Sequence, residues 1–258
     1  MPELPEVETF KHYFDETSLN QTISSLKIID NRILNANESE LRKLVINNKF
    51  KSSTRHGKHL LVNLGQGYLI MHFGMTGDLE YYNKKDEDPK YSKVIFYFNN
   101  GYNLAYTSQR MFGRIDIANS IEDFIQKKKL GPDGLKMSFE EFKRALNKRS
   151  ALIKNALMNQ SFIAGIGNIY SDEILFKSKI NPYSKIDSLT ENQAKELFDN
   201  IKKVLKFGIE KEGDLSIYPN NFLIPHRKKE EHCPICNYEI TRYDISGRRG
   251  FFCPNCQI

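Results

Sequence analysis

The chain has 258 residues, of which 40% are hydrophobic, so it can bury a sizeable core and has the length of two compact units. Thirty-eight Lys and Arg against thirty-two Asp and Glu give a formal net charge of +6, a modest bias towards polyanionic partners. No stretch approaches the roughly eighteen uninterrupted apolar residues of a membrane span, and the acidic N-terminus is unlike a signal peptide. We therefore expect an intracellular, cytoplasmic protein with no membrane partner.

The opening residues, MPELPEVETF, predict a helix. Pro5 suits the first helical position, where its missing N–H has no cost, and the acidic residues after it suit the positive end of the helix dipole. Apolar residues then recur at helical spacing, at Val7, Phe10 and Phe14. A helix explains these positions but leaves Pro2 and Glu3 unexplained.

Short runs of alternating apolar and polar residues follow, separated by glycine and asparagine turn signals. They cover residues 23–29, 58–64, 67–73, 78–82, 93–98 and 103–107. Strands of this length and spacing are typical of an antiparallel sandwich or barrel. We assign the N-terminal β-sandwich domain to residues 1–130.

A cluster of helix breakers, LGPDGL at 130–135, ends the strand pattern, and helical signals follow it. Ser138 with Glu141, and Thr190 with Gln193, have the spacing of capping boxes that begin two helices. The first would cover 139–148 and the second starts at 191; two further helical segments, 150–160 and 168–178, are joined by GIG. A helical domain is therefore predicted over 131–215.

All the cysteines lie near the C-terminus, in two C-x2-C pairs that are sixteen residues apart: Cys233, Cys236, Cys253 and Cys256. Four thiolates at this spacing suit a closed tetrahedral site for one structural Zn²⁺; two disulfides are the alternative, which an intracellular location disfavours. The segments 238–243 and 248–252 can pair as a hairpin between the cysteine pairs. We assign 216–258 to a zinc-finger hairpin whose folding depends on the metal. The fold class is α+β.

Three separated motifs now occur in one order: PELPEVE at 2–8, GIGNIYSDE at 165–173 and GRRGFFCPNCQ at 247–257. Together they resemble the formamidopyrimidine-DNA glycosylase and endonuclease VIII family of DNA repair enzymes, and the likeness spans the whole chain. It implies a catalytic sandwich domain, a helix-two-turn-helix DNA-binding domain and a zinc finger. It also implies a bifunctional DNA glycosylase and abasic-site lyase of base excision repair, which acts on double-stranded DNA containing damaged bases or abasic sites. The sequence itself is silent on the oligomeric state, and a monomer is the default expectation.

The resemblance gives Pro2 and Glu3 a catalytic role. In this family the initiator methionine is removed, and the proline amine attacks C1′ of the damaged nucleotide to form an iminium, which leads to strand cleavage by β,δ-elimination. An α-amino group has an ordinary pKa of about 7.7–8.0, against about 10.4 for lysine, so part of it is unprotonated without burial. Glu3 can protonate the sugar ring oxygen. If Met1 remains, the nucleophile is blocked.

The family's contacts to the DNA backbone map onto four residues of this chain. Lys58 matches the lysine at the phosphate beside the lesion, and Arg248 matches the zinc-finger arginine that clamps a phosphate. Asn168 matches a residue of the helix-two-turn-helix element and is also expected to cap its helix. Lys154 matches a lysine that touches the backbone. Solvated lysines, Lys58 at a strand start and Lys154 on a helix, are the alternative.

An enzyme that extrudes a base must fill the gap left in the duplex. In the formamidopyrimidine branch a methionine, an arginine and a phenylalanine do so, and this chain offers Met75, Arg110 and Phe112 at matching positions. Ordinary loop and core packing is the alternative. Ser108 stands where the family usually has aspartate, and this departure is expected to loosen the loop.

Two departures lie in the hairpin. Arg249 stands where the family usually has a small residue, which makes it a competitor of Arg248 for the clamp. Gly250 stands where the family often has threonine.

The sequence features divide on the preferred lesion. The N-terminal motif and the gap-filling set favour oxidised purines, such as 8-oxoguanine and formamidopyrimidines. The stretch 208–222 is shorter than the lesion-capping loop of that branch, and FLIPHR at 222–227 is more like the endonuclease VIII branch, which prefers oxidised pyrimidines. We expect oxidised purines. The alternative of a non-catalytic zinc-containing DNA-binding protein would not explain Pro2 with Glu3. The alternative of a metal-dependent nuclease is disfavoured because this sequence offers no convincing cluster of carboxylates and histidines for a catalytic metal.

Overall fold

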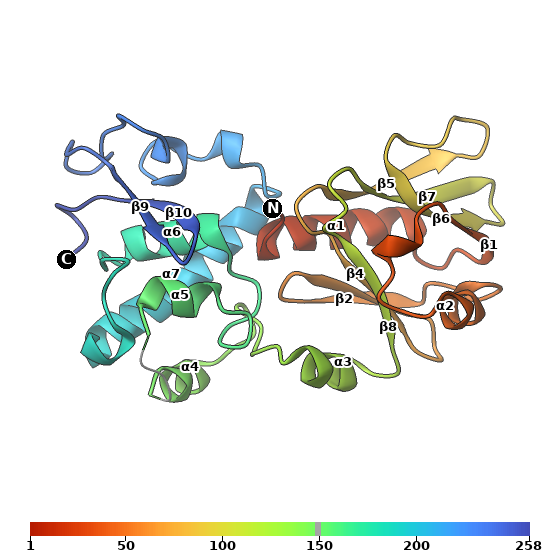
Figure 1. Cartoon of the computed structure of the whole chain (residues 1–258), viewed down its shortest axis with the longest axis horizontal. Helices are drawn as coiled ribbons and strands as arrows, with labels where there is room; N and C mark the ends of the chain where they lie inside the picture. Colours follow the sequence, from red (N-terminus) through yellow and green to blue (C-terminus); the bar gives the residue numbers. More distant parts are fainter. Residues whose placement is uncertain (148–150) are drawn as a thin grey trace. The chain divides into compact units, whose positions relative to one another are not determined.

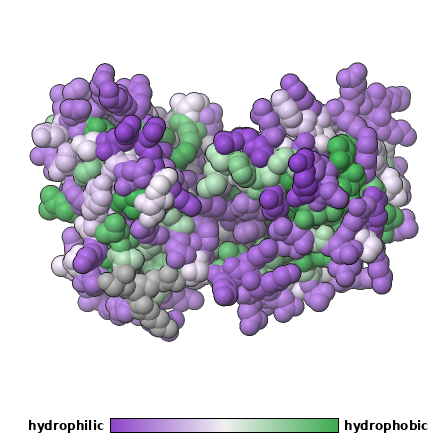
Figure 2. Space-filling view, viewed as in Figure 1, coloured by the Kyte–Doolittle hydropathy of each residue, from purple (hydrophilic) through white to green (hydrophobic). Residues whose placement is uncertain are grey.

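A computed structural model of the chain describes residues 1–147 and 151–258. These residues form two compact units, the first made of Met1–Pro2 and Glu6–Lys128 and the second of Glu3–Pro5 and Lys129–Ile258 (Figure 1). The division near residue 128 is close to the predicted one at 130, whereas the predicted boundary at 215 stays a prediction. No helix of the described residues is long and apolar enough to cross a bilayer. Hydrophilic side chains dominate the face seen in Figure 2.

The first unit contains antiparallel sheets, as predicted. One has the order β1-β6-β7-β5, with β1 (Ile23–Ile28), β6 (Ser92–Phe98), β7 (Tyr102–Ser108) and β5 (Gly77–Asn83). The other has the order β2-β3-β4-β8, with β2 (Ser52–His56), β3 (His59–Asn63), β4 (Tyr68–His72) and β8 (Arg114–Ala118). Helix α1 (Leu4–Ser18) contributes Val7 and Phe14 to the apolar core of this unit, where the rings of Phe14 and Phe50 lie 5.1 Å apart.

Several elements of the first unit were not predicted from the sequence: β2, β8, α2 (Glu38–Val45), α3 (Ile121–Lys128) and the short 3₁₀ helix η1 (Asn31–Ile33). Strand β2, SSTRH, lies at the edge of its sheet and has no apolar alternation that could mark it as a strand. Lys58 therefore does not begin a strand. It lies in the tight turn between β2 and β3, beside Gly57 with φ 56°.

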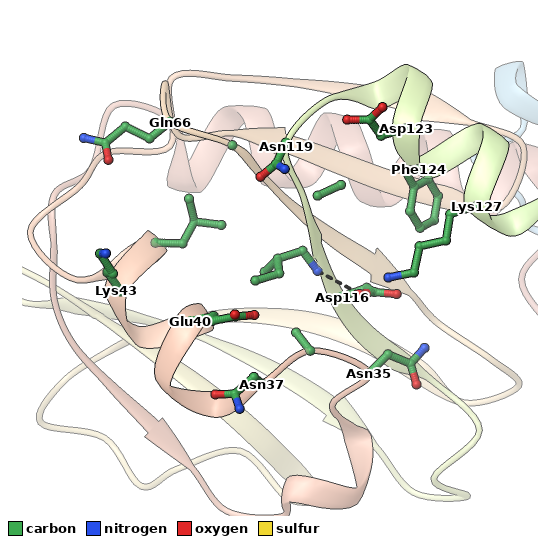
Figure 3. Close-up of a pocket in the computed structure, with 15 residues that line it drawn as sticks. Asn35, Asn37, Glu40, Lys43, Gln66, Asp116, Asn119, Asp123, Phe124 and Lys127 are labelled. Carbon is green, nitrogen blue, oxygen red and sulfur yellow. Dashed lines mark hydrogen bonds between the residues drawn. The ribbon is translucent and has the colours of Figure 1, made fainter.

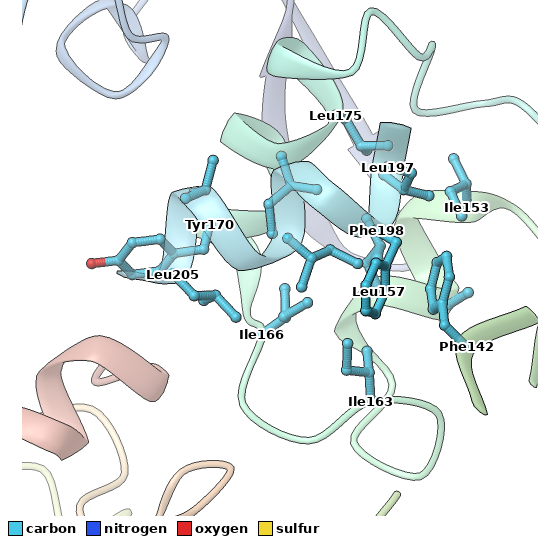
Figure 4. Close-up of a cluster of buried hydrophobic side chains, with 14 of the residues drawn as sticks. Phe142, Ile153, Leu157, Ile163, Ile166, Tyr170, Leu175, Leu197, Phe198 and Leu205 are labelled. Carbon is cyan, nitrogen blue, oxygen red and sulfur yellow. The ribbon is translucent and has the colours of Figure 1, made fainter. Parts of the chain in front are cut away.

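The second unit is mainly helical, with α4 (Phe139–Leu146), α5 (Ile153–Met158), α6 (Asn168–Lys177) and α7 (Glu191–Glu210). Short 3₁₀ helices lie between and after them: η2 (Ile186–Ser188), η3 (Leu215–Ile217) and η4 (Ile224–His226). Their apolar faces pack into one core, which includes Phe142, Leu157, Leu197 and Leu205 (Figure 4). The segment predicted as a helix over 150–160 is helical from Ile153, and Lys148 and Ser150 of the predicted segments lie outside the described residues.

Both predicted capping boxes are confirmed. Ser138 caps α4 with Glu141, and Thr190 caps α7 with Gln193; in each pair the two residues exchange side-chain and backbone hydrogen bonds. The predicted hairpin is present, with its second strand, β10 (Arg248–Phe252), at the predicted residues; its first strand, β9 (Thr241–Ile245), lies later than the predicted 238–243, because the turn takes only two residues. Both turn residues have positive φ, 54° at Ser246 and 71° at Gly247, as a tight hairpin turn requires.

The cap of α7 offers a test of this helical unit. We expect Thr190→Ala to lower the free energy of unfolding by about 1 kcal/mol, because the N–H of Gln193 loses the hydroxyl that accepts its hydrogen bond at 3.2 Å. Thr190→Ser keeps the acceptor and should leave stability almost unchanged. Urea titration measures both, and an equal loss in the two variants would contradict the capping role.

Candidate active site

The carboxylate of Glu3 is buried against the start of helix α6, with the residue only 2% exposed. One oxygen accepts a hydrogen bond from the N–H of Ile169 at 2.9 Å, and the other accepts from the N–H of Gly167. The first amides of a helix have no partner within the helix, and the helix dipole favours negative charge there. The helix therefore fixes the position of this carboxylate.

Glycines make room for the N-terminal segment at this helix start. A Cβ on Gly167 would lie 2.3 Å from the carboxyl carbon of Glu3, and a Cβ on Gly165 would lie 2.5 Å from Cδ1 of Leu4. Gly165 also has φ +115°, which side chains rarely adopt, and its carbonyl accepts the N–H of Leu4 at 3.0 Å. The GIG sequence at 165–167 is thus a docking surface for residues 3 and 4.

Pro2 precedes this anchored carboxylate in the chain and is half-buried, whereas Met1 is 47% exposed. An exposed first residue is accessible to a peptidase. Its removal would leave a secondary amine on the residue next to Glu3, which is the arrangement that the sequence predicts for an amine nucleophile with an adjacent acid.

Lys154 is fully buried, so its interpretation as a solvated helix lysine is wrong. Its ammonium group donates to the carbonyl of Asn168 at 2.9 Å, to Oγ of Ser171 at 2.7 Å and to Oδ1 of Asp172. Burial lowers the pKa of Lys154, and the charge of Asp172 opposes that effect. All three ammonium hydrogens have acceptors inside the protein. A contact between Lys154 and DNA stays a prediction.

Asn168 does not cap helix α6, contrary to the sequence prediction. Gly167 occupies the cap position, and Asn168 is the first helical residue. The amide nitrogen of Asn168 donates to the carbonyl of Arg249 at 2.7 Å, while its Oδ1 is buried with no hydrogen-bond partner among the described residues. Asn168 therefore ties α6 to the hairpin.

Arg248 is exposed at the start of β10, next to the hairpin turn. Its guanidinium approaches Sδ of Met158 at 3.8 Å, and no carboxylate pairs with it in the described part of the chain. Successive side chains of a strand point to opposite faces. Arg248 and Arg249 therefore cannot serve the same phosphate from the same face of the hairpin, which separates the two candidates for the clamp.

The candidate gap-filling residues lie on two neighbouring loops of the first unit. Met75 and Phe112 are 40% and 52% exposed, so core packing does not explain them, and the guanidinium of Arg110 lies 5.3 Å from the centre of the Phe112 ring. The N–H of Arg110 donates to Oγ1 of Thr76 at 2.9 Å. A Cβ on Gly74 would lie 2.3 Å from the backbone of Phe112, so glycine is needed where the loops meet. Ser108 is the departure that predicts a looser loop. It is buried and belongs to strand β7 rather than to the loop.

Sequence reasoning missed a pair of half-buried histidines in the first unit. The rings of His59 and His72 lie 5.0 Å apart on paired strands, and burial lowers their pKa values to about 3 and about 4. They line a small pocket of about 140 Å³ together with Arg114. Lys58, which is 6% exposed, adds to the lowering of the His72 pKa. Only strand register brings these residues together, and a single sequence does not reveal register.

A larger hollow of about 600 Å³ lies between α2, β8 and α3 (Figure 3). Its side chains carry both charge signs, with Glu40 and Lys43 from α2 and Asp123 and Lys127 from α3. None of the predicted site residues is among the described residues that line it. We therefore do not take this hollow as the candidate active site, although it is larger than the pocket beside the histidines.

The cysteine sulfurs converge at one end of the hairpin, with their Sγ atoms all within 4.8 Å of one another. Sγ of Cys233 lies 3.8 Å from that of Cys256, and Sγ of Cys236 lies 3.5 Å from that of Cys253. These distances exclude disulfides, whose S–S length is about 2.05 Å. They fit the edges of a tetrahedron with Zn–S bonds of about 2.3 Å, so the predicted metal ligands form a group suited to a zinc finger.

Comparisons with known proteins agree with this arrangement. Residues 1–115 match the family model of the formamidopyrimidine-DNA glycosylase N-terminal domain, and residues 130–218 match that of its H2TH domain. A formamidopyrimidine-DNA glycosylase of Pelotomaculum thermopropionicum is 34% identical over 273 residues, covering 100% of this chain and 99% of that protein. One of Mycoplasma genitalium is 35% identical over 273 residues, covering 100% and 96%.

Solved structures give the same result. The Lactococcus lactis enzyme in complex with DNA that contains an abasic site superimposes with a TM-score of 0.88 at 29% identity, covering 99% of each chain. MutM in complex with DNA that contains carbocyclic 8-oxo-G superimposes with a TM-score of 0.89 at 28% identity, again over 99% of each chain. The chain therefore belongs to the formamidopyrimidine-DNA glycosylase family.

Proposed function

We propose that this protein is a bifunctional DNA glycosylase and abasic-site lyase that removes oxidised purines from double-stranded DNA through an N-terminal proline. The observation that carries the proposal is the Glu3 carboxylate, held by the N–H groups of Gly167 and Ile169 next to Pro2 in the chain. Glu3 also caps helix α6, but that structural role does not require an imino acid directly before it in the chain. A non-catalytic DNA-binding protein would have no use for this pair.

The chemistry starts when Met1 has been removed. The free amine of Pro2 attacks C1′ of the damaged nucleotide, the bond from C1′ to the base breaks, and the base leaves with a proton. Opening of the sugar ring then breaks the bond from C1′ to O4′, and Glu3, after taking up a proton from solvent, donates the proton that O4′ needs. The resulting iminium withdraws electrons from the sugar, so loss of a C2′ proton expels the 3′ phosphate and a second elimination expels the 5′ phosphate.

The remaining site residues hold and deform the DNA in this proposal. Arg248 has no carboxylate partner in the described residues and is accessible to a phosphate, which its planar guanidinium can bind through two hydrogen bonds. Met75, Arg110 and Phe112 are exposed on two adjacent loops, as residues that replace an extruded base must be. The cysteine group would hold one Zn²⁺, which supplies folding energy to the hairpin and takes no part in the chemistry.

The segment before the zinc finger bears on the choice of lesion. Phe222 stacks on Phe207 of α7 with ring centres 4.6 Å apart, and Tyr218 is buried beside them. This short stretch is thus packed onto α7 and has little length left to cover a lesion. The packing favours one alternative within the same family, an endonuclease VIII-like preference for oxidised pyrimidines.

Borohydride trapping tests the proposed mechanism. Duplexes with 8-oxoguanine, a formamidopyrimidine, thymine glycol, dihydrouracil or an abasic site should each report whether a covalent adduct forms, and mass spectrometry should map it to Pro2. Glu3→Gln should slow base removal by about 10²–10⁴-fold, the usual contribution of a positioned acid or base. Pro2→Gly should weaken trapping.

The relative rates on this panel choose between purine and pyrimidine lesions. An active protein whose N-terminus still carries Met1, or an adduct on a lysine, would overturn the proline mechanism. No adduct on any duplex, with Met1 shown to be absent, would overturn the enzyme proposal.

Gly167→Ala tests the docking of Glu3. The new Cβ would meet the carboxyl group at 2.3–2.7 Å, so the carboxylate must move away from the helix start. A displacement of about 1 Å at a reacting group can cost about 10² in rate, and we expect a loss of that size in single-turnover base removal. Gly101→Ala is the control, because a Cβ there has only Lys84 near, at 4.0 Å; its φ of +87° makes alanine more strained in the backbone there than at Gly167, whose φ is −126°, so backbone strain alone would impair the control more. Full activity of Gly167→Ala would show that the Glu3 position is not critical.

Metal removal tests the role of the cysteine group. Prolonged chelation should release one Zn²⁺ per chain, and hydrogen exchange of residues 233–256 should rise while the strands of the first unit stay protected, since the metal supplies the folding energy of so small a unit. Brief chelation that leaves the zinc bound should not reduce activity in the absence of Mg²⁺. Immediate loss of activity with the zinc still bound would favour a metal-dependent nuclease.

A further inference from the structure

Asp172 lies at the centre of a buried network in the second unit and is only 1% exposed. Its Oδ1 accepts from the Lys154 ammonium and from the hydroxyl of Tyr243 at 2.5 Å. Its Oδ2 accepts from Nη2 and Nε of Arg227 at 2.5 and 3.1 Å, and from the N–H of Phe251 at 3.1 Å. These donors belong to separate segments: α5, the residue after η4, β9 and β10.

The acceptor capacity of this carboxylate is fully used. An ionised carboxylate has about four lone-pair sites, and donors from four different residues of the described chain occupy those of Asp172. A buried charge is tolerated only when it is paired and hydrogen-bonded in this way. Two of the donors are on the hairpin. Asp172 therefore keeps all of its hydrogen bonds only while the hairpin stays in this position on α6.

The glycine at position 250 belongs to the same arrangement. Gly250 is paired with Tyr243 across the hairpin, and a Cβ on Gly250 would lie 2.3 Å from Cζ of the Tyr243 ring. The phenol ring therefore crosses the space above Gly250 on its way to Asp172. This explains the departure noted in the sequence, because a threonine at 250 would occupy the space that the ring needs.

The hairpin meets α6 at two points whose spacing matches. Asn168 donates to the carbonyl of Arg249, and Asp172 accepts the N–H of Phe251. Four residues along a helix advance about 6 Å, and two residues along a strand advance about 6.6 Å, so Asn168 and Asp172 on one face of α6 can hold Arg249 and Phe251 together. Arg248 directly precedes this doubly held stretch.

We infer that Asp172 is a positioning residue: it fixes the register of the zinc hairpin on helix α6 so that Arg248 meets a DNA phosphate. The inference rests on the proposed function, since it assigns Arg248 a phosphodiester ligand. The cysteine group holds the far end of β10 at Cys253, and Asp172 holds the middle of the strand. The metal alone therefore does not set the orientation of the hairpin.

A double-mutant cycle on DNA binding tests this inference. Arg248→Ala in the otherwise unchanged protein should weaken binding to an undamaged duplex about tenfold, the effect of one lost charge-assisted hydrogen bond. It should also lower the slope of log affinity against log salt by about one. Asp172→Asn should produce most of the same two effects while zinc content stays at one per chain. When Arg248→Ala is added to Asp172→Asn, the affinity for the duplex should then fall less than twofold further.

Two further variants separate positioning from general damage. Tyr243→Phe removes only the hydroxyl contact to Asp172 and should give a smaller effect in the same direction, also non-additive with Arg248→Ala. Asp199→Asn is the matched control, because Asp199 pairs with Lys195 on the surface of α7 and should leave affinity and salt slope unchanged. If Asp172→Asn loses its zinc or fails to fold, the cycle with Tyr243→Phe decides.

Additive effects in the cycle would overturn the inference, because Asp172 would then act independently of Arg248. Unchanged affinity in both Asp172→Asn and Tyr243→Phe would overturn it as well. The readout is equilibrium binding and needs no catalysis. If the effects of the Asp172 and Arg248 variants are coupled but no duplex forms an adduct with Pro2, the proposed function is rejected and the positioning role stands. If an adduct with Pro2 forms but the effects are not coupled, the positioning role is rejected and the proposed function stands.

Discussion

The second unit depends on one constraint: the first amides of helix α6 have no acceptor within the helix and must find one elsewhere. A helix start must find acceptors for its first N–H groups, and here the carboxylate of Glu3 accepts from Gly167 and Ile169. Glu3 is separated from these residues by more than 160 positions, so the contact closes a long loop of the chain. The helix gains a cap, and the same contact places the N-terminal segment.

The other side of that helical turn is also occupied. Lys154 donates to the carbonyl of Asn168 and to Ser171, and Ser171 donates to the carbonyl of Gly167. Burial lowers the pKa of Lys154, and the charges of Asp172 and, to a smaller extent, Glu3 oppose that effect. Lys154 therefore contacts the same first turn of α6 that Glu3 caps, and it also donates to Asp172.

Helix α6 is buried over most of its length, so its buried carboxylates accept hydrogen bonds from other segments of the unit. Besides Asp172, Glu173 is fully buried; it accepts the N–H of Ile224 at 2.8 Å, and burial raises its pKa to about 7. Asp172 and Glu173 thus hold different segments of the unit, while Oε1 of Glu173 has no hydrogen-bond partner among the described residues. A helix with an ordinary solvated face could not organise so many neighbours.

Local chemistry explains which parts of this structure the sequence could predict. The caps at Ser138 and Thr190, the cysteine group and the hairpin depend on residues that are close in sequence or of unmistakable type. Strand β2 and the burial of Lys154 could not be predicted, because a polar edge strand and a buried lysine are stabilised only by partners distant in the chain. The same limit applies to Asn168: its sequence position suggests a cap, but Glu3 already supplies the acceptor that a cap would provide. With that task taken by Glu3, the Asn168 side chain is free to donate to the carbonyl of Arg249, and it joins Asp172 in holding the hairpin on α6.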